Sequence, residues 1–378
     1  MSPSPSSAGR ADTIRVLDLF AGAGGLSEGF RAASERFRSV GAVEMDTAAA
    51  ATYAANHGAV GLYAGPIERW LEEADPPEVD VIVGGPPCQG FSTLGKRDAA
   101  DLRNRLWESY AETIARTRPK FFVVENVPTF LKSPELVQFR AATQPGGRIA
   151  EYTFEAHPLN AADFGAPQSR RRAILIGRHR DIPGPGFPLP TTPREDWRTV
   201  RDAIGDLAGR PTAVDLPERT VEFGERTLPG PFLTSELHVG RTYRQVSIDR
   251  FAAIPYGGNR FDLPFELQAT CWQNHRSGSA DVMGRLVWEK PSVTIRTEFF
   301  KPEKGRYLHP TEHRALTHLE AARLQGFPDD YLWVGSRTAI ARQIGNAVPI
   351  PLGRAIARHL LAALDGETTS PEALLALR

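Results

Sequence analysis

Short apolar runs alternate with amphipathic segments from Thr13 to about Arg178. This alternation is typical of a parallel sheet whose strands are connected by helices that cover both faces. The sequence therefore predicts an α/β fold with a doubly wound, mostly parallel sheet. The predicted strands span residues 14–19, 39–43, 79–83, 121–125, 152–157 and 173–177, and the predicted helices span 26–35, 48–56, 106–116 and 134–142.

The pattern changes near Asp181, where five prolines lie between Pro183 and Pro193 and the alternation stops for about a hundred residues. We expect a smaller, β-rich or irregular domain over residues 181–282, a catalytic domain formed by 12–180 and 283–378, and a disordered N-terminus over 1–11. Within the last segment we expect a β-rich stretch at 286–296 and a final helix at 352–364. Thr317 and Glu320 have the spacing of a helix-capping box.

Composition narrows the class of protein. A hydrophobic content of 41% over 378 residues is that of a globular protein. No apolar run is long enough to span a membrane, and the N-terminus lacks the apolar centre of a signal peptide, so we expect a cytoplasmic protein without a membrane partner. Two distant cysteines, Cys88 and Cys271, predict neither a disulfide framework nor a paired-cysteine zinc site, and we expect no metal. A net charge of zero means that nucleic-acid contacts must come from local basic patches.

A glycine-rich turn follows the first predicted strand, in the block Asp18 to Gly25. Small residues there let the backbone approach a ligand at the start of a helix. Glu44 ends the second strand, where a carboxylate can accept hydrogen bonds from ribose hydroxyls. Both S-adenosylmethionine and a nicotinamide dinucleotide suit this geometry, although Ser27 stands at the usual third glycine. Alternatively, Glu44 and Asp46 cap the following helix.

A second turn, Gly84-Gly85-Pro86-Pro87-Cys88, follows a predicted strand and is stiff enough to hold a thiol in a cleft. A single cysteine is more often a small buried hydrophobe, but this turn favours a nucleophile. Glu125-Asn126-Val127 and the block Gln168 to Arg172 follow later strands. We therefore expect a nucleophile, a carboxyl group and a guanidinium group to meet at one edge of the sheet.

Together these blocks resemble the S-adenosylmethionine-dependent DNA (cytosine-5) methyltransferases of the bacterial modification type. Nearly the whole chain is covered, and two further blocks match: Arg314 to Phe327, containing Leu-Gln-Gly-Phe-Pro, and Gln343 to Pro349. The resemblance implies a class I, Rossmann-like methyltransferase fold with a target-recognition domain at 181–282. It also implies methylation of carbon 5 of a flipped-out cytosine in duplex DNA.

The resemblance assigns four catalytic residues. Cys88 would add to carbon 6 of cytosine, which makes carbon 5 electron-rich enough to take the methyl group. Glu125 would supply a proton or hydrogen bond at ring nitrogen 3. Arg170 would stabilise charge on the ring near the cytosine carbonyl, and Arg172 would fix the loop.

The cofactor implied is S-adenosylmethionine, which leaves as S-adenosylhomocysteine. Many family members have Asp-Ile where this chain has Pro66-Ile67, so the hydrogen bond to the adenine amine must come from elsewhere. Leu106 would pack on the adenine. The cofactor-binding residues implied are Phe20, Ala21, Gly22, Gly24, Glu44, Met45, Ile67, Pro87, Leu106, Asn346 and Ala347.

The partner implied is double-stranded DNA, with a separate restriction endonuclease acting on the same site, and we expect a monomer. Gln89 and Ser92, in a segment that would close over DNA, are predicted DNA contacts. Within 181–282, the side chains able to read bases or phosphates are Arg241, Arg244, Arg250, Asn259, Arg260, Gln268, Gln273, Asn274, His275 and Arg276.

Two alternatives stay open on the sequence. A tRNA cytosine-5 methyltransferase uses the same catalytic blocks, but that branch carries Cys-Phe-Thr in its recognition region, whereas here Cys271 is followed by Trp272 and Gln273. A catalytically silent DNA-binding relative would have lost its nucleophile or cofactor residues, and this chain retains them.

Overall fold

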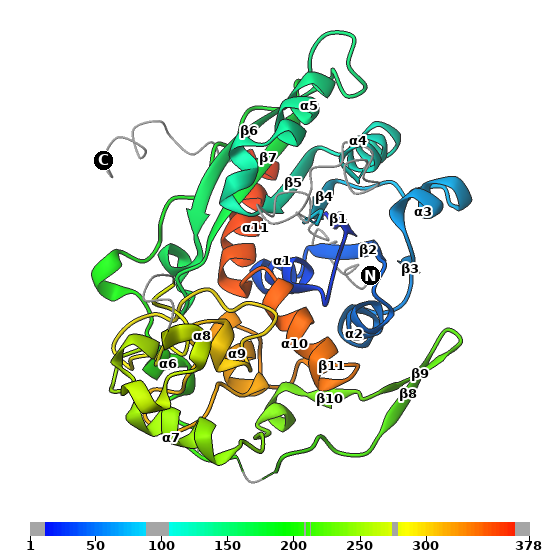
Figure 1. Ribbon diagram of the computed structural model, residues 1–378. Coiled ribbons are helices and arrows are strands. Elements are labelled where there is room, and N and C mark those ends of the chain that lie inside the picture. The colour runs from blue at the N-terminus through cyan, green and yellow to red at the C-terminus, as the bar shows by residue number, and fades with distance from the viewer. Residues whose placement is uncertain (1–11, 88–105, 208, 212, 274–278, 367–378) are drawn as a thin grey trace, which may run out of the picture.

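The computed structural model describes residues 12–87, 106–207, 209–211, 213–273 and 279–366 (Figure 1). Its centre is a seven-stranded sheet with the order β3-β2-β1-β4-β5-β7-β6. β7 is antiparallel to both neighbours and the other pairs are parallel, which confirms the predicted mostly parallel sheet. The strands are β1 (Ile14–Leu19), β2 (Phe37–Glu44), β3 (Leu62–Ala64), β4 (Val81–Gly84), β5 (Phe121–Asn126), β6 (Tyr152–Asn160) and β7 (Arg171–His179).

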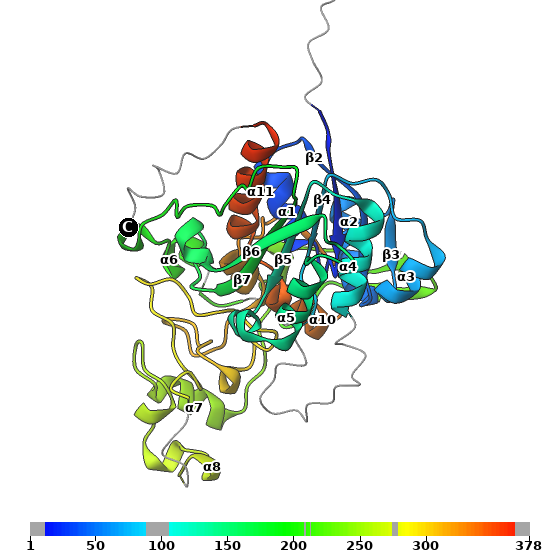
Figure 2. The same ribbon diagram turned by 90° about the horizontal axis from the view of Figure 1, so that it is seen from above.

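Helices cover both faces of the sheet (Figure 2). In β4 the side chains of Val81 and Val83 belong to one apolar core and that of Ile82 to another, and none of the three is exposed. Burial on both faces explains why the strands are continuous apolar runs. The first core contains α1 (Gly25–Ala33) and α11 (Ile350–Leu364), and the second contains α3 (Ile67–Glu73), α4 (Leu106–Thr117) and α5 (Pro134–Ala142).

The remainder of the chain is mostly irregular, with short helices and two small antiparallel sheets, β8–β9 and β10–β11. Part of it shares a third core with the C-terminal region, in which Ile204 and Phe232 pack with Leu286 and Ile344. α7 and α8 project away from the large sheet (Figure 2). The boundaries at 181 and 282 stay predictions. The elements are α6 (Val200–Ile204), β8 (Thr220–Phe223), β9 (Arg226–Pro229), β10 (Phe232–Leu233), α7 (Gln245–Ala253), α8 (Thr270–Gln273), α9 (His318–Gln325), β11 (Leu332–Trp333) and α10 (Arg337–Asn346).

The expected β-rich stretch at 286–296 is wrong: these residues form no strand of any sheet, and only an isolated bridge joins Ser292 to Gln168. The backbone groups of its second half bond instead to the chain before β7, and those of its first half bond to Leu308 and to the start of α6. Ser292 N donates to Pro167 O at 2.9 Å, and Ile295 N donates to Gln168 Oε1 at 2.8 Å. The apolar pattern there reflects burial against this turn, not strand pairing.

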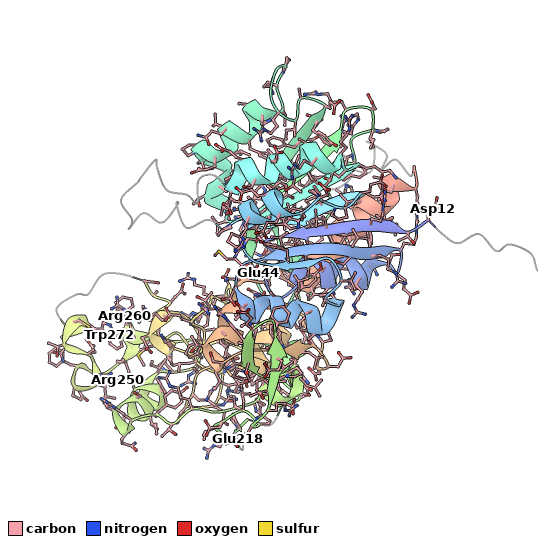
Figure 3. All side chains as sticks on the ribbon, turned by 90° about the vertical axis from the view of Figure 1, so that its right-hand side faces the viewer. Asp12, Glu44, Glu218, Arg250, Arg260 and Trp272 are labelled. Atoms are coloured by element: carbon pink, nitrogen blue, oxygen red, sulfur yellow. The ribbon has the colours of Figure 1, made fainter. Side chains whose placement is uncertain are left out.

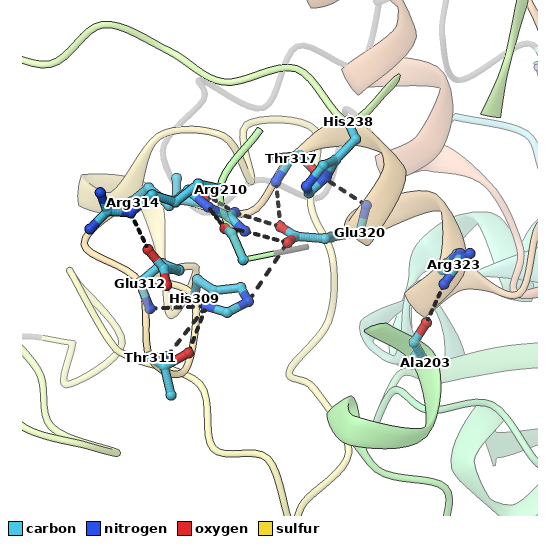
Figure 4. A network of polar contacts seen from close by, with 12 residues as sticks. Ala203, Arg210, His238, His309, Thr311, Glu312, Arg314, Thr317, Glu320 and Arg323 are labelled. Carbon is cyan, nitrogen blue, oxygen red and sulfur yellow. Dashed lines mark hydrogen bonds and ion pairs between the residues drawn. The ribbon is translucent and has the colours of Figure 1, made fainter. Parts of the chain in front are cut away.

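A buried polar network fixes the start of α9 (Figure 4). Thr317 and Glu320 form the predicted capping box. Arg314 donates to both carboxylate oxygens of Glu320, at 2.8 and 2.6 Å. Burial acts to raise the pKa of Glu320, but the hydrogen bonds from Arg314 hold it below its usual value. The ion pair therefore ties the loop before α9 to the first turn of the helix.

Within the described residues, no single helix has the length and apolar character of a membrane span, and only α10 and α11 taken together, with a bend of 41°, meet that criterion.

Candidate active site

The carboxyl ends of β1, β2, β4 and β5 lie at one edge of the sheet because these strands are parallel neighbours. β7 runs the other way, so its first residues reach the same edge: Asn126 pairs with Ala173, and Glu125 with Ile174. Figure 3 shows Glu44 at this edge and Asp12 at the opposite end of the sheet. The blocks identified in the sequence thus converge where α/β sheets bind ligands.

The glycine-rich turn after β1 adopts left-handed backbone conformations. Gly22 and Gly24 have φ values of 56° and 86°, which glycine adopts without steric cost, and Phe20 has a φ of 57°, which is uncommon for a residue with a side chain. A Cβ atom added at Gly22 would meet no atom within 4 Å, so open space lies beside the turn. Tyr331 fixes the turn, because its hydroxyl group donates a hydrogen bond to Ala23 O.

Glu44 fastens this turn to the end of β2. Its Oε2 accepts from Gly22 N at 2.8 Å, and its Oε1 accepts from Asp46 N at 2.7 Å. Burial raises the pKa of Glu44, and the two backbone hydrogen bonds act against that rise. Asp46 alone caps α2 (Thr47–His57), since its Oδ1 accepts from the amides of Ala48 and Ala49. The capping alternative therefore applies to Asp46, not to Glu44.

Other expected cofactor residues differ in exposure. Met45 is 70% exposed at the end of β2, an unusual place for a large apolar side chain, and Asn346 is exposed at the end of α10. Leu106 is half-buried, whereas Ile67 is 2% exposed inside the core. Pro66 precedes α3 without a side-chain cap. Ala21 and Ala347 are buried, and Pro87 is exposed.

Three of these features fit a nucleoside cofactor such as S-adenosylmethionine. They are the open space beside Gly22, the carboxylate of Glu44 at the end of β2, and the exposed apolar side chain of Met45, on which an adenine ring can pack. The described residues contain no group of three or more His, Cys, Asp or Glu side chains that can hold a metal ion.

Glu125 ends β5 beside the turn that follows β4. Arg172 Nε lies 2.7 Å from Glu125 Oε1, and their side chains are 13% and 11% exposed. A Cβ atom added at Gly85 would lie 3.1 Å from Glu125 Oε2, so the glycine lets the turn pass close to this carboxylate. Arg172, expected only to fix the loop, is thus the arginine that pairs with Glu125.

Asn126 anchors the same turn. Its Nδ2 donates to Pro86 O at 3.0 Å, and its Oδ1 accepts from Val127 N at 2.8 Å. The chain therefore leaves β4 toward Cys88 in a path held against the end of β5. Cys88, Gln89 and Ser92 lie outside the described residues.

Arg170 is 2% exposed, and the charge of Glu125 acts to raise its pKa, but its hydrogen-bond partners lie elsewhere. Its two terminal nitrogens donate to Ile295 O at 2.7 Å and Gly345 O at 3.0 Å. Burial lowers the pKa of Arg170 to about 9, with Arg172 acting in the same direction. Arg170 therefore joins the start of β7 to the segment at 292–297 and to the end of α10.

A buried cluster around Asp18 lies beneath the glycine turn and was not identified from the sequence. Ser27 Oγ donates to Asp18 Oδ2 at 2.8 Å and lies 3.0 Å from the Tyr53 hydroxyl. Asp18 is 1% exposed, and burial raises its pKa to about 7. The signal for this cluster in the sequence is the carboxylate of Asp18 between the apolar residues Leu17 and Leu19 of β1.

Several side chains expected to read DNA bond to their own part of the chain. Arg250 donates to Leu267 O, and Asn259 accepts from Phe261 N. Arg260 is 8% exposed, whereas Arg241 and Arg244 are exposed. Gln268 and Gln273 donate to backbone carbonyls of Leu263 and Phe265. Residues 274–276 lie outside the described part.

Comparison with known proteins agrees with the site. The chain matches the family of C-5 cytosine-specific DNA methylases over residues 14–362. It is 33% identical to the Type II methyltransferase M.XorII of Xanthomonas oryzae, over 96% of this chain and 88% of that protein. It is 34% identical to the Type II methyltransferase M1.HphI of Haemophilus parahaemolyticus, over 92% and 87%.

Among solved structures, the chain is similar to a prophage-encoded protein of Escherichia coli described as a DNA modification methyltransferase. The TM-score is 0.69 at 24% identity, over 93% of this chain and all of that one, which supports the fold. The family match spans most of the chain and includes the strand ends that carry Glu44, Glu125 and Arg172. The chain therefore belongs to the C-5 cytosine-specific DNA methylase family.

Proposed function

We propose that this chain transfers a methyl group from S-adenosylmethionine to carbon 5 of a cytosine in a specific duplex DNA sequence, through a covalent bond to Cys88. The observation that carries the proposal is the Glu125–Arg172 pair at the end of β5, beside the turn that leads to Cys88. A carboxyl and a guanidinium group held this close can bind one edge of a pyrimidine together.

The chemistry follows from the electronics of cytosine, whose carbon 5 is a poor nucleophile. The Cys88 thiolate adds to carbon 6, and electron density moves toward carbon 5, ring nitrogen 3 and the carbonyl oxygen. Glu125 in its protonated form provides the proton or hydrogen bond at nitrogen 3, and Arg172 donates to the carbonyl oxygen. Carbon 5 then takes the methyl group. Water or hydroxide removes the carbon 5 proton, the electrons of that bond restore the ring double bond, and the carbon–sulfur bond breaks to release Cys88 as a thiolate.

The bound cofactor would supply an electrophilic methyl group. Glu44 would hold the ribose at the end of β2, Met45 would cover one face of the adenine, and the open side of Gly22 would admit the rest of the molecule. Asn346 and Ala347 would close the pocket from the end of α10.

A cytosine stacked in a duplex hides both faces of carbons 5 and 6, so the proposal includes rotation of the target base out of the helix. Since the relatives are Type II methyltransferases, it also includes a cognate restriction endonuclease that recognises the same site. The monomeric state and the cytoplasmic location stay predictions from the sequence.

The decisive experiment traps the covalent bond. Duplex DNA containing 5-fluorocytosine in the recognised sequence, with S-adenosylmethionine, should give a denaturant-resistant complex with the wild-type protein and none with Cys88→Ala. Cys271→Ala is the matched control, because Cys271 is the other cysteine and is exposed, and it should trap normally. A complex that persists in Cys88→Ala would contradict the mechanism.

Two further measurements define the substrate. Bisulfite sequencing of DNA from cells that express the chain identifies the methylated sequence. Transfer of labelled methyl groups to tRNA but not to duplex DNA would contradict the proposed DNA substrate.

A further inference from the structure

A cavity of about 500 Å³ lies between the segment at 239–243, the loop before α9 and the start of α10. None of its lining residues is a predicted catalytic or cofactor residue, and Arg241 is among the predicted DNA contacts. Its volume is within the range of small-molecule sites, about 300–1,000 Å³. Its lining includes four arginines: Arg210, Arg241, Arg314 and Arg337.

Two of these arginines have anionic partners. Arg210 Nε lies 3.2 Å from Glu312 Oε2, and Arg314 is paired with buried Glu320. Arg241 and Arg337 form no ion pair with any residue in the described ranges. Arg337 donates to the carbonyl oxygens of Val214 and Gly240, at 2.6 and 2.7 Å. The Arg241 guanidinium group lies 5.9 Å from the centre of the Tyr243 ring.

The charge of Arg241 also reaches Arg337. Burial lowers the pKa of Arg337, the charge of Asp215 raises it, and the charge of Arg241 lowers it by a smaller amount. Two like charges near a partly buried cavity repel each other unless an anion lies between them. Guanidinium groups match phosphate oxygens well, because their N–H donors form a planar fork.

His318 also lines the cavity, and one of its ring nitrogens has no hydrogen-bond partner among the described residues. Its Nε2 lies 2.8 Å from Arg337 O, and because a carbonyl only accepts, Nε2 carries the proton. Nδ1 is then a bare acceptor, and it has no hydrogen-bond partner among the residues described. The ring is 2% exposed and stacks on Phe300, with a centroid separation of 5.7 Å. The Nδ1 atom is itself buried, and the ring lines the cavity beside Phe300.

We propose that this cavity binds a small phosphorylated molecule, with its phosphate between Arg241 and Arg337 and its carbon portion against Phe300 and Ile248. The arginines of the lining favour an anionic group, and its apolar side chains favour a carbon surface. The proposal does not depend on the methyl-transfer mechanism.

Calorimetric titration of the full chain with inorganic phosphate and with ribose 5-phosphate tests it. Both should bind the wild type, and ribose 5-phosphate should bind more tightly, because it adds hydroxyl groups and carbon surface. Arg241→Gln should weaken both by about tenfold or more, since a charge-assisted hydrogen bond is lost. The matched control, Arg226→Gln, changes an exposed arginine of β9 outside the cavity and should bind both ligands normally.

Two results would overturn the proposal. The first is no binding of either ligand by the wild type, and the second is equal binding by Arg241→Gln and the wild type. If the first result is found and Arg241→Gln also loses affinity for duplex DNA, Arg241 is a contact of the DNA backbone. A thermal unfolding curve for Arg241→Gln that matches the wild type excludes loss of folding.

Discussion

Arg172 Nε lies 2.7 Å from Glu125 Oε1, in an ion pair that is mostly removed from solvent. The pair forms because β5 and β7 are antiparallel neighbours, so that the end of one strand meets the start of the other. Arg170 is only two residues away, yet it bonds to Ile295 and Gly345. The two arginines of this block therefore have different partners.

The pair predicts that Arg172 contributes to the rate of methyl transfer. Arg172→Gln should lower the single-turnover rate on duplex DNA by about 10²–10³-fold, the usual loss when one preorganised donor is removed. S-adenosylmethionine affinity should not change. Arg171→Gln is the control, because Arg171 is the exposed neighbour on the same strand. An Arg172→Gln enzyme with the wild-type rate would show that this guanidinium group does not reach the ring.

Arg170, by contrast, should contribute mainly to stability. Arg170→Ala leaves the buried carbonyl groups of Ile295 and Gly345 without their donor, which should cost about 3 kcal/mol of unfolding free energy. Urea unfolding measures this loss, and Arg171→Ala should stay within about 0.5 kcal/mol of the wild type. If Arg170→Ala unfolds at the wild-type urea concentration but loses its activity, Arg170 acts in the chemistry instead.

The sheet and most of its helices could be predicted because their signals are local. Strands buried on both faces are continuous apolar runs, and α5 (Pro134–Ala142) spans the predicted residues. The short strand β3 and helix α3 were missed, since three and seven residues carry little periodicity. The capping box at Thr317 needed only two residues at a fixed spacing.

The different partners of Arg170 and Arg172 could not be predicted, because they depend on distant parts of the chain. Arg170 turns toward Ile295 and Gly345, which are more than a hundred residues away in sequence. Within the stretch 286–296, which the sequence suggested for a strand, this interaction uses the carbonyl of Ile295, and the amides of Ser292 and Ile295 bond to the chain before β7. Similarly, Arg250 and Asn259 resemble DNA contacts in sequence but bond to nearby backbone.

Asn126 should position the turn that leads to Cys88. Asn126→Ala removes the hydrogen bond to Pro86 O. A lost buried hydrogen bond of about 1–3 kcal/mol corresponds to a roughly 5–140-fold slower formation of the covalent complex with 5-fluorocytosine DNA. S-adenosylmethionine affinity should stay the same. Ser133→Ala is a control of similar destabilisation, because it removes the cap of α5 and leaves the turn intact. Equal trapping rates for the two variants would contradict a positioning role.

Asp18 should make the stability of the fold depend on pH. Its folded pKa is about 7, against a usual value of 3.8, and burial is the main cause. Between these two values the folded state holds a proton that the unfolded state has released. Stability therefore falls as the pH rises through this window, by up to about 4 kcal/mol for this group.

Asp18→Asn cannot ionise and still offers an oxygen to Ser27 Oγ, so it should lack this loss and be more stable than the wild type at about pH 8. Urea unfolding of both proteins between about pH 5 and 8 measures the difference. The buried His57 and His318, whose pKa values are lowered to about 4 by burial, give the opposite trend, with stability lost toward acid, but they act equally in both proteins. Parallel stability curves for Asp18→Asn and the wild type would mean that Asp18 does not titrate in this range.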